Sequence, residues 1–218
     1  MIKPDEIIRS RRRTLSISVD AFARLIVRAP IRCSEERIFT FLQEKEAWIV
    51  QKQAERRGAG IVLPPEDLNG YTFLLLGALR EIRLTDTKKI ALEEGKIFLP
   101  KDQPQKRLTA WLKSNAKRIL TEETARIAAQ MGVEYHSVTI SSARSRWGSC
   151  SADNKIRYSF RLLYAPKEVV EYVVTHELAH IRYKNHSPAF WTEVAKYQPN
   201  YKAKRKWLKT HGALMYIF

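Results

Sequence analysis

Cysteine, glycine and long apolar segments are scarce in this sequence, and their scarcity excludes several classes of protein. The 218 residues include 2 cysteines and 8 glycines. Because Cys33 and Cys150 lie far apart in the sequence, they lack the spacing typical of a disulfide framework, and a reducing compartment fits them. The longest apolar run, residues 73–76, is too short to cross a bilayer. A disulfide-rich secreted domain and a membrane-spanning helix are therefore not expected.

Acidic side chains are also few in comparison with basic ones. The sequence has 39 lysines and arginines against 23 aspartates and glutamates, which gives a formal net charge of +16 at pH 7. Such a charge attracts polyanions, although a soluble protein with many surface lysines has the same balance. We expect at most weak, non-specific nucleic-acid binding that falls with added salt. The candidate surface is the basic tail, with Lys202, Lys204, Arg205, Lys206 and Lys209.

The remaining composition is that of an ordinary globular protein. Hydrophobic residues make up 44% of the chain and charged residues 28%. A chain of this length can bury the core of one large domain or of two small ones. The first residues contain no apolar segment typical of a signal peptide, so we expect a cytoplasmic protein without a membrane anchor. The sequence does not indicate an oligomeric state.

Alternating apolar and polar residues are typical of the first hundred positions. Residues 11–29 alternate on both sides of Asp20, which predicts a β-hairpin. Ser34 is a favourable N-cap for a helix that is predicted to run to about Arg57. Four further strands are predicted, at 71–76, 79–84, 88–92 and 96–99.

Helical periodicity is typical of the second half, and Pro100 and Pro104 mark a candidate boundary before it. A long helix is predicted over about 105–131. The elements that follow are strands at 137–142 and 155–163, and helices at about 166–183, 187–197 and 202–209. The sequence thus predicts an α+β fold, with a β-rich part at 1–100 and a helical part with a small sheet at 101–218. These two parts can also form one continuous unit.

Two histidines four residues apart, with a glutamate directly after the first, carry the clearest chemical information. His176 and His180 share one face of the predicted helix, so their imidazoles can converge on one metal ion. Glu177 lies about 100° around the helix from His176, where its carboxylate can reach water at the metal without being a ligand. This position suits a general base. Random placement of the 5 histidines would produce such a motif in roughly one chain in a hundred.

A third protein ligand is expected, because catalytic zinc sites use three. His186 is the simplest candidate, since Asn185 can adopt the left-handed conformation that turns the chain back after the helix. Glu193 on the following helix is the alternative, although a solvated glutamate explains it better. His136 and His211 are assigned to no site. The expected ion is Zn²⁺, for which Ni²⁺ or Co²⁺ can substitute at nitrogen ligands.

These motifs resemble those of the YgjP-like metal-dependent hydrolases, which are related to the WLM and SprT-like zinc metallopeptidase domains. The resemblance rests on three stretches, Arg146-Trp147-Gly148-Ser149-Cys150-Ser151, His176 to His180, and Asn185-His186-Ser187-Pro188-Ala189-Phe190-Trp191. The resemblance is close over about residues 140–195, and in the rest of the chain it extends only to the general order of the predicted elements. It implies a zincin-like catalytic half with three histidine ligands and a glutamate base, and it names no physiological substrate.

The residues just before the metal helix are candidates for a substrate cleft. A strand within 144–151 can bind an extended peptide backbone along its edge. Trp147 can form the floor of the cleft, although core packing explains this tryptophan equally well. Arg144 or Arg146 can hold a carboxylate or phosphate. Cys150 is expected to be a small buried hydrophobic residue rather than a ligand.

Together these features predict a zinc-dependent metallohydrolase of the peptidase type, in which Glu177 activates water against an amide bond of a peptide or protein. Tyr183, Tyr197 and the two arginines are unranked candidates for stabilising the charge that develops on the substrate. Two alternatives stay open. One is a nucleic-acid-associated protease acting on DNA-bound proteins, and the other is a non-catalytic zinc protein, which a fourth protein ligand would reveal.

Overall fold

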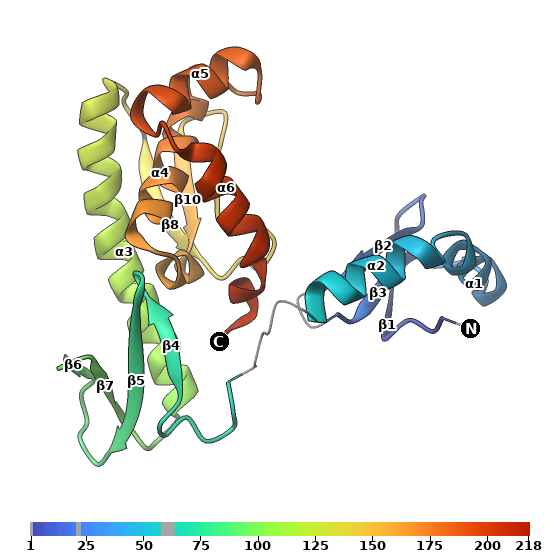
Figure 1. Cartoon of the computed structure of the whole chain (residues 1–218), viewed down its shortest axis with the longest axis horizontal. Helices are drawn as coiled ribbons and strands as arrows, with labels where there is room; N and C mark the ends of the chain where they lie inside the picture. Colours follow the sequence, from blue (N-terminus) through green and yellow to red (C-terminus); the bar gives the residue numbers. More distant parts are fainter. Residues whose placement is uncertain (1, 21–22, 58–63) are drawn as a thin grey trace. The chain divides into compact units, whose positions relative to one another are not determined.

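The computed structural model describes residues 2–20, 23–57 and 64–218 (Figure 1). The packing of the chain separates two compact units, one formed by the described residues up to Arg57 and the other by nearly all of those from Pro64 on. The first unit is formed by the N-terminal quarter of the chain. The second unit contains nearly all of the remainder, including every residue that the sequence assigned to chemistry.

The first unit packs a three-stranded sheet against two helices. Its strands are β1 (Glu6–Ser10), β2 (Ser16–Val19) and β3 (Leu25–Pro30), in the order β1-β3-β2. The predicted hairpin is confirmed, because β2 and β3 pair antiparallel. Strand β1, which pairs parallel with β3, was not predicted. The small core combines one face of β3 with the helices, through Leu25, Val27, Ala29, Ile38, Leu42 and Ile49.

The single long helix predicted for this unit is wrong, because the chain forms two helices, α1 (Glu35–Glu44) and α2 (Glu46–Arg57). Ser34 is the N-cap as expected, and its hydroxyl accepts a hydrogen bond from the Arg37 amide at 3.3 Å. Lys45 leaves helical geometry with φ −105° and ψ 10°. The sequence pattern misses this break because the buried positions keep helical spacing across it.

The second unit begins with a four-stranded sheet, ordered β4-β5-β7-β6. Its strands are β4 (Thr72–Leu75), β5 (Ala78–Thr85), β6 (Ala91–Glu93) and β7 (Lys96–Pro100). The buried side chains of this sheet, such as Ile82 and Leu99, belong to the same core as the long helix α3 (Pro104–Met131). The packing therefore differs from the boundary expected near residue 100. The two prolines instead end a strand and begin a helix, two local roles that proline fits.

A second sheet and a group of helices complete this unit. Strands β8 (Ser137–Ser141), β9 (Gly148–Cys150) and β10 (Lys155–Ser159) lie in the order β8-β10-β9. The 3-10 turn η1 (Phe160–Tyr164) replaces the end of the strand predicted over 155–163. The final elements are α4 (Lys167–Arg182), α5 (Pro188–Tyr197), α6 (Tyr201–Thr210) and η2 (Gly212–Tyr216).

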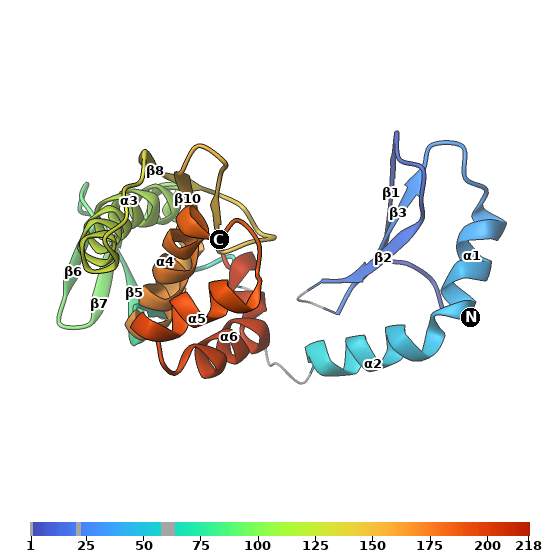
Figure 2. The same ribbon diagram turned by 90° about the horizontal axis from the view of Figure 1, so that it is seen from above.

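Helix α4 is the central element of the second unit. It contacts α3, α5, α6 and strand β9, and Figure 2 shows it between α3 and the pair formed by α5 and α6. The predicted helices of this unit are confirmed, with Gly132 as the left-handed C-cap of α3 at φ 62°. The expected α+β fold is also confirmed. No helix in the described part of the chain is long and apolar enough to cross a membrane.

The last residue of α4 ties three helices together. Arg182 donates to the carbonyl oxygens of Met131 at 2.7 Å and Gly132 at 3.1 Å, at the C-terminal end of α3. Carbonyl groups at that end have no partner inside the helix, and the guanidinium supplies one. Arg182 also forms an ion pair with Glu193, which lies on α5 and is 2% exposed. The ion pair thereby links the middle of α5 to the end of α4.

Candidate metal centre

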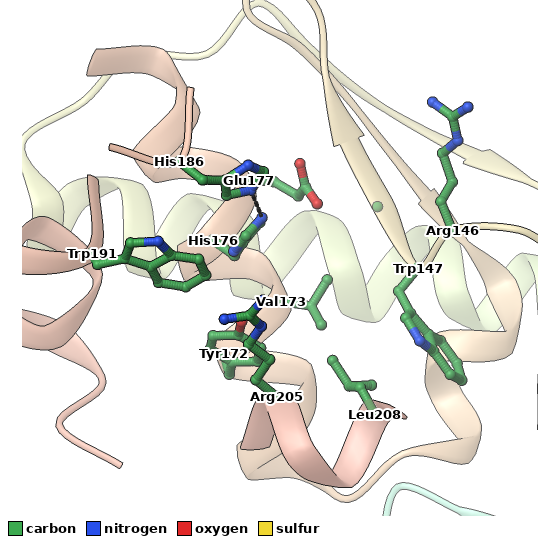
Figure 3. Close-up of a pocket in the computed structure, with 11 residues that line it drawn as sticks. Arg146, Trp147, Tyr172, Val173, His176, Glu177, His186, Trp191, Arg205 and Leu208 are labelled. Atoms are coloured by element: carbon green, nitrogen blue, oxygen red, sulfur yellow. Dashed lines mark hydrogen bonds between the residues drawn. The ribbon is translucent and has the colours of Figure 1, made fainter. Parts of the chain in front are cut away.

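Three histidines converge at the surface of α4. His176 and His180 come from α4 itself, and His186 comes from the connection to α5. One ring nitrogen from each lies within 4.8 Å of the others. The Nε2 atoms of His176 and His186 are 3.1 Å apart (Figure 3). One proton can link two ring nitrogens, whereas a cation can satisfy all three at once.

A backbone contact orients the ring of His180, and a side-chain contact holds the connection that carries His186. The Nδ1 atom of His180 lies 3.0 Å from the carbonyl oxygen of Tyr183, the C-cap of α4. If Nδ1 donates its hydrogen there, Nε2 keeps a free lone pair, as a metal ligand requires. The connection to α5 is held by the Asn185 carboxamide, which accepts a hydrogen bond from the Ser187 amide at 3.3 Å. The left-handed backbone expected at Asn185 is wrong, because its side chain makes this turn instead.

Aromatic rings form a wall behind the histidines. Phe190 is fully buried, and its ring centroid lies 4.6 to 4.9 Å from those of the three imidazoles. Trp191 stacks on His186 at 5.5 Å and, with an interplanar angle of 15°, on Tyr201 of α6 at 5.2 Å. These contacts restrict the rotation of His186, whose position on a connection would otherwise leave it free to turn. The sequence named Phe190 and Trp191 only as part of a resemblance.

Burial favours the neutral imidazole of His176 and of His180. It lowers the pKa of His176 to about 3, and the nearby His180 and His186 add to the shift. Burial also lowers the pKa of His180. A neutral imidazole is the form that binds metals, so the donor set fits a divalent ion. In contrast with His180, Nδ1 of His176 is buried without a hydrogen-bond partner in the described chain, and the Nε2 atom of His176 faces His186.

Glu177 lies beside the histidines and is 5% exposed. Strand β9 makes room for it, because a Cβ atom added to Gly148 would lie 2.6 Å from Oε1 and 2.8 Å from Cγ of Glu177. Burial raises the pKa of Glu177 to about 8, and the positive charge of Arg146 opposes the shift. Like the charge of Arg146, a divalent cation at the histidines would lower this raised pKa. The carboxylate could then act as a base near neutral pH.

The alternative ligand Glu193 is absent from the metal centre. Its carboxylate binds Arg182 and, at 2.9 Å, Lys196. These two cations pair with the Glu193 carboxylate, which lies outside the group of three histidines. Cys150 is also outside the group of ligand atoms, and its half-buried thiol has a pKa raised by burial.

A cleft of about 620 Å³ opens beside the metal centre. Arg146 and Trp147 line it as expected, and Trp147 also packs against the core, so both of its proposed roles have support. Arg144 and Tyr183 do not line it within the described chain. Tyr183 instead ends α4 and offers its carbonyl to His180.

The cleft also contains residues that the sequence did not assign to the site. Tyr172 precedes His176 by four positions, so helical spacing alone could have placed it on the same face. Trp191, Arg205 and Leu208 come from α5 and α6. No local pattern could have placed them, because the packing of these helices on α4 brings them to the cleft.

Comparison with known families agrees with this geometry. The family model of the YgjP-like metallopeptidase domain matches residues 13–211. This chain belongs to the YgjP-like family. As a YgjP-like protein it is a hydrolase of the metallopeptidase type, which uses a divalent metal and acts on a peptide or protein.

Two solved structures overlap part of the YgjP-like chain. The metallopeptidase zymogen of Pyrococcus abyssi abylysin is 23% identical, with a TM-score of 0.39, over 42% of this chain and 93% of that one. The metallopeptidase zymogen of Methanocaldococcus jannaschii jannalysin is 21% identical, with a TM-score of 0.37, over 41% and 91% of the two chains. No curated protein matches this chain.

The close approach of β9 to Glu177 leads to a first prediction. Replacing Gly148 with alanine should displace the Glu177 carboxylate while leaving the three histidines in place. We expect kcat to fall roughly 100-fold, because a misplacement of about 1 Å can cost that much, whereas metal content should be unchanged. Ser149→Ala on the same strand is the control. Full activity of Gly148→Ala would show that the position of Glu177 is not critical.

The raised pKa of Glu177 predicts a pH-dependent stability of the metal-free protein. Between pH 4.5 and about 8 the folded protein retains a proton that the unfolded chain releases. Raising the pH through this window therefore lowers the free energy of unfolding. Glu177→Gln, which cannot release this proton, should lose less stability over the same window.

Urea unfolding of both chelator-treated proteins at pH 6 and pH 8.5 measures this difference. His176 acts in the opposite direction, because its pKa of about 3 makes both proteins lose stability as the pH falls below 6.5. The comparison of the two proteins cancels this contribution. Equal pH dependence would mean that Glu177 is not buried as described.

Proposed function

We propose that His176, His180 and His186 bind one zinc ion and that Glu177 is the general base of amide hydrolysis. The supporting observation is the convergence of three ring nitrogens within 4.8 Å of one another beside a buried carboxylate. Among the described residues the ligand group has three members, which suits a catalytic site better than a closed structural one. This favours the enzyme over the non-catalytic zinc protein.

Three imidazoles are a donor set typical of zinc, although Ni²⁺ or Co²⁺ can replace it. When bound, zinc polarises the substrate carbonyl and lowers the pKa of water. The protein supplies the remaining chemistry. The Glu177 carboxylate takes a proton from the attacking water and transfers it to the leaving amine, and its burial brings its pKa close to neutral pH for both transfers.

The walls of the cleft suit an extended peptide. Strand β9 is an edge strand of its sheet, so one side of its backbone can pair with a substrate strand. Trp147 at the start of β9 offers an apolar surface to a substrate side chain. The substrate backbone would then lie along the free edge of β9, next to Glu177.

Tyr172 is the best-placed neutral donor for the charge that develops on the substrate oxygen. It lines the cleft, and its ring lies 5.9 Å from that of His176. Burial raises the pKa of Tyr172 to about 12, so its hydroxyl keeps its proton and can donate a hydrogen bond. Tyr183 and Tyr197, which the sequence suggested for this role, do not line the cleft in the described chain.

We also infer a cytoplasmic location, which the two free cysteines support because such thiols persist in a reducing compartment. Weak nucleic-acid binding by the basic residues of α6 stays a prediction. Helix α6 has no acidic residue in its first turn and exposes Lys202, Lys206 and Lys209. These charges would hold phosphates without reading a base sequence.

The proposed ligand set predicts the effect of removing His186. His186→Ala should weaken zinc binding by roughly 100-fold or more, since even residues that only orient a ligand can change metal affinity by 10 to 100-fold. Competition with a chromophoric chelator measures the affinity. His136→Ala, at an exposed histidine outside the group, is the matched control and should bind zinc normally. Equal affinities of the two variants would remove His186 from the site.

The proposed base predicts a different result for Glu177→Gln. Glutamine keeps the size of the side chain and cannot accept the proton, so hydrolysis of an unfolded protein should fall about 10² to 10⁴-fold. Zinc content and folding should stay unchanged. Glu168→Gln, an exposed position in the first turn of α4, is the control and should keep full activity. Activity of Glu177→Gln within a few-fold of the wild type would exclude Glu177 as the base.

A further inference from the structure

Arg205 lies between two adjoining hollows on α6. It lines the cleft beside the metal centre together with Leu208. It also lines a second hollow of about 440 Å³, whose other lining residues are all lysines, namely Lys202, Lys206 and Lys209. A ligand that extends from the metal centre past Arg205 therefore enters a surface that carries only positive side chains.

A contact with an aromatic ring holds the guanidinium of Arg205 in place. It lies over the ring of Trp191, 5.0 Å from the centroid. Trp191 in turn stacks between His186 and Tyr201. Figure 3 shows the head group directed from α6 toward Tyr172 and His176. A guanidinium stacked on an aromatic face keeps its N–H groups free at the edge, where they can bind a carboxylate with two hydrogen bonds.

The charge of Arg205 has no counterpart in the described chain. Some arginines of this unit have acidic partners, as Arg182 has in Glu193 and Arg126 in Glu123. No ion pair of Arg205 or Arg146 with a carboxylate is found among the described residues. Glu177 is the single acidic residue that lines the cleft within the described ranges, and the proposed function assigns it to the chemistry. A substrate can supply the missing negative charge.

We propose that this cleft selects peptides that carry acidic residues next to the scissile bond. Arg205 binds the first carboxylate, and the hollow of Lys202, Lys206 and Lys209 attracts the acidic residues that follow. From Lys202 to Lys209 the helix rises about 10 Å, which is the length of about three residues of extended peptide. This selectivity rests on the proposed function, because it assumes that hydrolysis occurs at the three histidines.

Duplex DNA is the competing occupant of the same lysines. Backbone phosphates would bind exposed cations anywhere on α6 and would not need the connection to the metal centre. Because Arg205 lines both hollows, we expect instead a ligand that reaches both of them. A peptide whose cleaved bond lies at Glu177 and whose acidic residues lie along α6 meets that condition.

The first test measures selectivity by hydrolysis with the zinc-loaded full chain. Fluorogenic peptides differ only in three residues on one side of the scissile bond, which are all Glu, all Gln or all Lys, with a second set for the other side. Wild type should cleave one Glu peptide with kcat/KM about tenfold above its Gln counterpart, because each charge-assisted hydrogen bond favours the acid. The preference should shrink with added salt.

Substitutions of Arg205 test whether this residue causes the preference for the Glu peptide. Arg205→Gln should lower kcat/KM for the Glu peptide about tenfold and by a clearly smaller factor for the Gln peptide, so that the preference is lost. Arg205→Lys should keep part of the preference, because it keeps the charge. Arg118→Gln removes an exposed arginine of α3 and should leave the preference intact. Equal loss on both peptides would overturn the proposal, since Arg205 would then act on the metal centre through Trp191.

A second test measures binding and does not depend on turnover. Zinc-loaded Glu177→Gln is titrated with labelled Glu, Gln and Lys peptides and with a duplex DNA, followed by fluorescence anisotropy. The Glu peptide should bind about tenfold more tightly than the Gln peptide, and adding Arg205→Gln should remove the difference. If the Glu peptide binds in this way while no peptide is cleaved by the wild type, the proposed function fails and the acidic selectivity stands. If DNA binds and the Glu and Gln peptides bind equally, the acidic selectivity is overturned.

Discussion

The burial of helix α4 is the constraint on which the site depends. The helix packs against α3, α5, α6 and β9, and most of its side chains are inside the core. Removing water from His176 lowers its pKa, and removing water from Glu177 raises the pKa of its carboxyl. Both groups therefore favour their uncharged forms in the absence of a cation. A divalent ion offsets this cost for the carboxylate and uses the neutral imidazoles directly.

A second anchor determines where the proposed third ligand lies. His186 belongs to a short connection, and such a segment needs both of its ends held to present a side chain accurately. Arg182 holds the first end through α3, and its ion pair with Glu193 holds α5 at the other. Phe190 and Trp191, at the beginning of α5, then pack on the ring of His186. Glu193 thus supports the proposed metal centre by placing the candidate ligand His186 rather than by being a ligand itself.

The cleft has two walls of different character. On one side, β9 presents a glycine against Glu177 and an unpaired strand edge, which suits the backbone of a substrate. On the other side, α6 presents Arg205 and its lysines, which suits acidic side chains. Backbone pairing is independent of sequence, so the proposed selectivity for acidic residues comes from the second wall. In the YgjP-like chain this division assigns catalysis to α4, general binding to β9 and selection to α6.

Local periodicity and a coordination rule were enough for the chemistry proposed at α4. The spacing of His176, Glu177 and His180 follows from 3.6 residues per helical turn, and the need for a third ligand singled out His186. The caps at Ser34 and Gly132 could also be predicted, because each depends on its neighbours alone. Only the tertiary structure decided the contacts between elements. These contacts join segments that are separated in the chain, and they are the approach of Gly148 to Glu177, the pairing of Glu193 with Arg182 and the place of Arg205 in the cleft. The core that α3 shares with the sheet of β4 to β7 was also decided by the tertiary structure. Burial depends on which surfaces meet, and the spacing of residues within one element does not determine this.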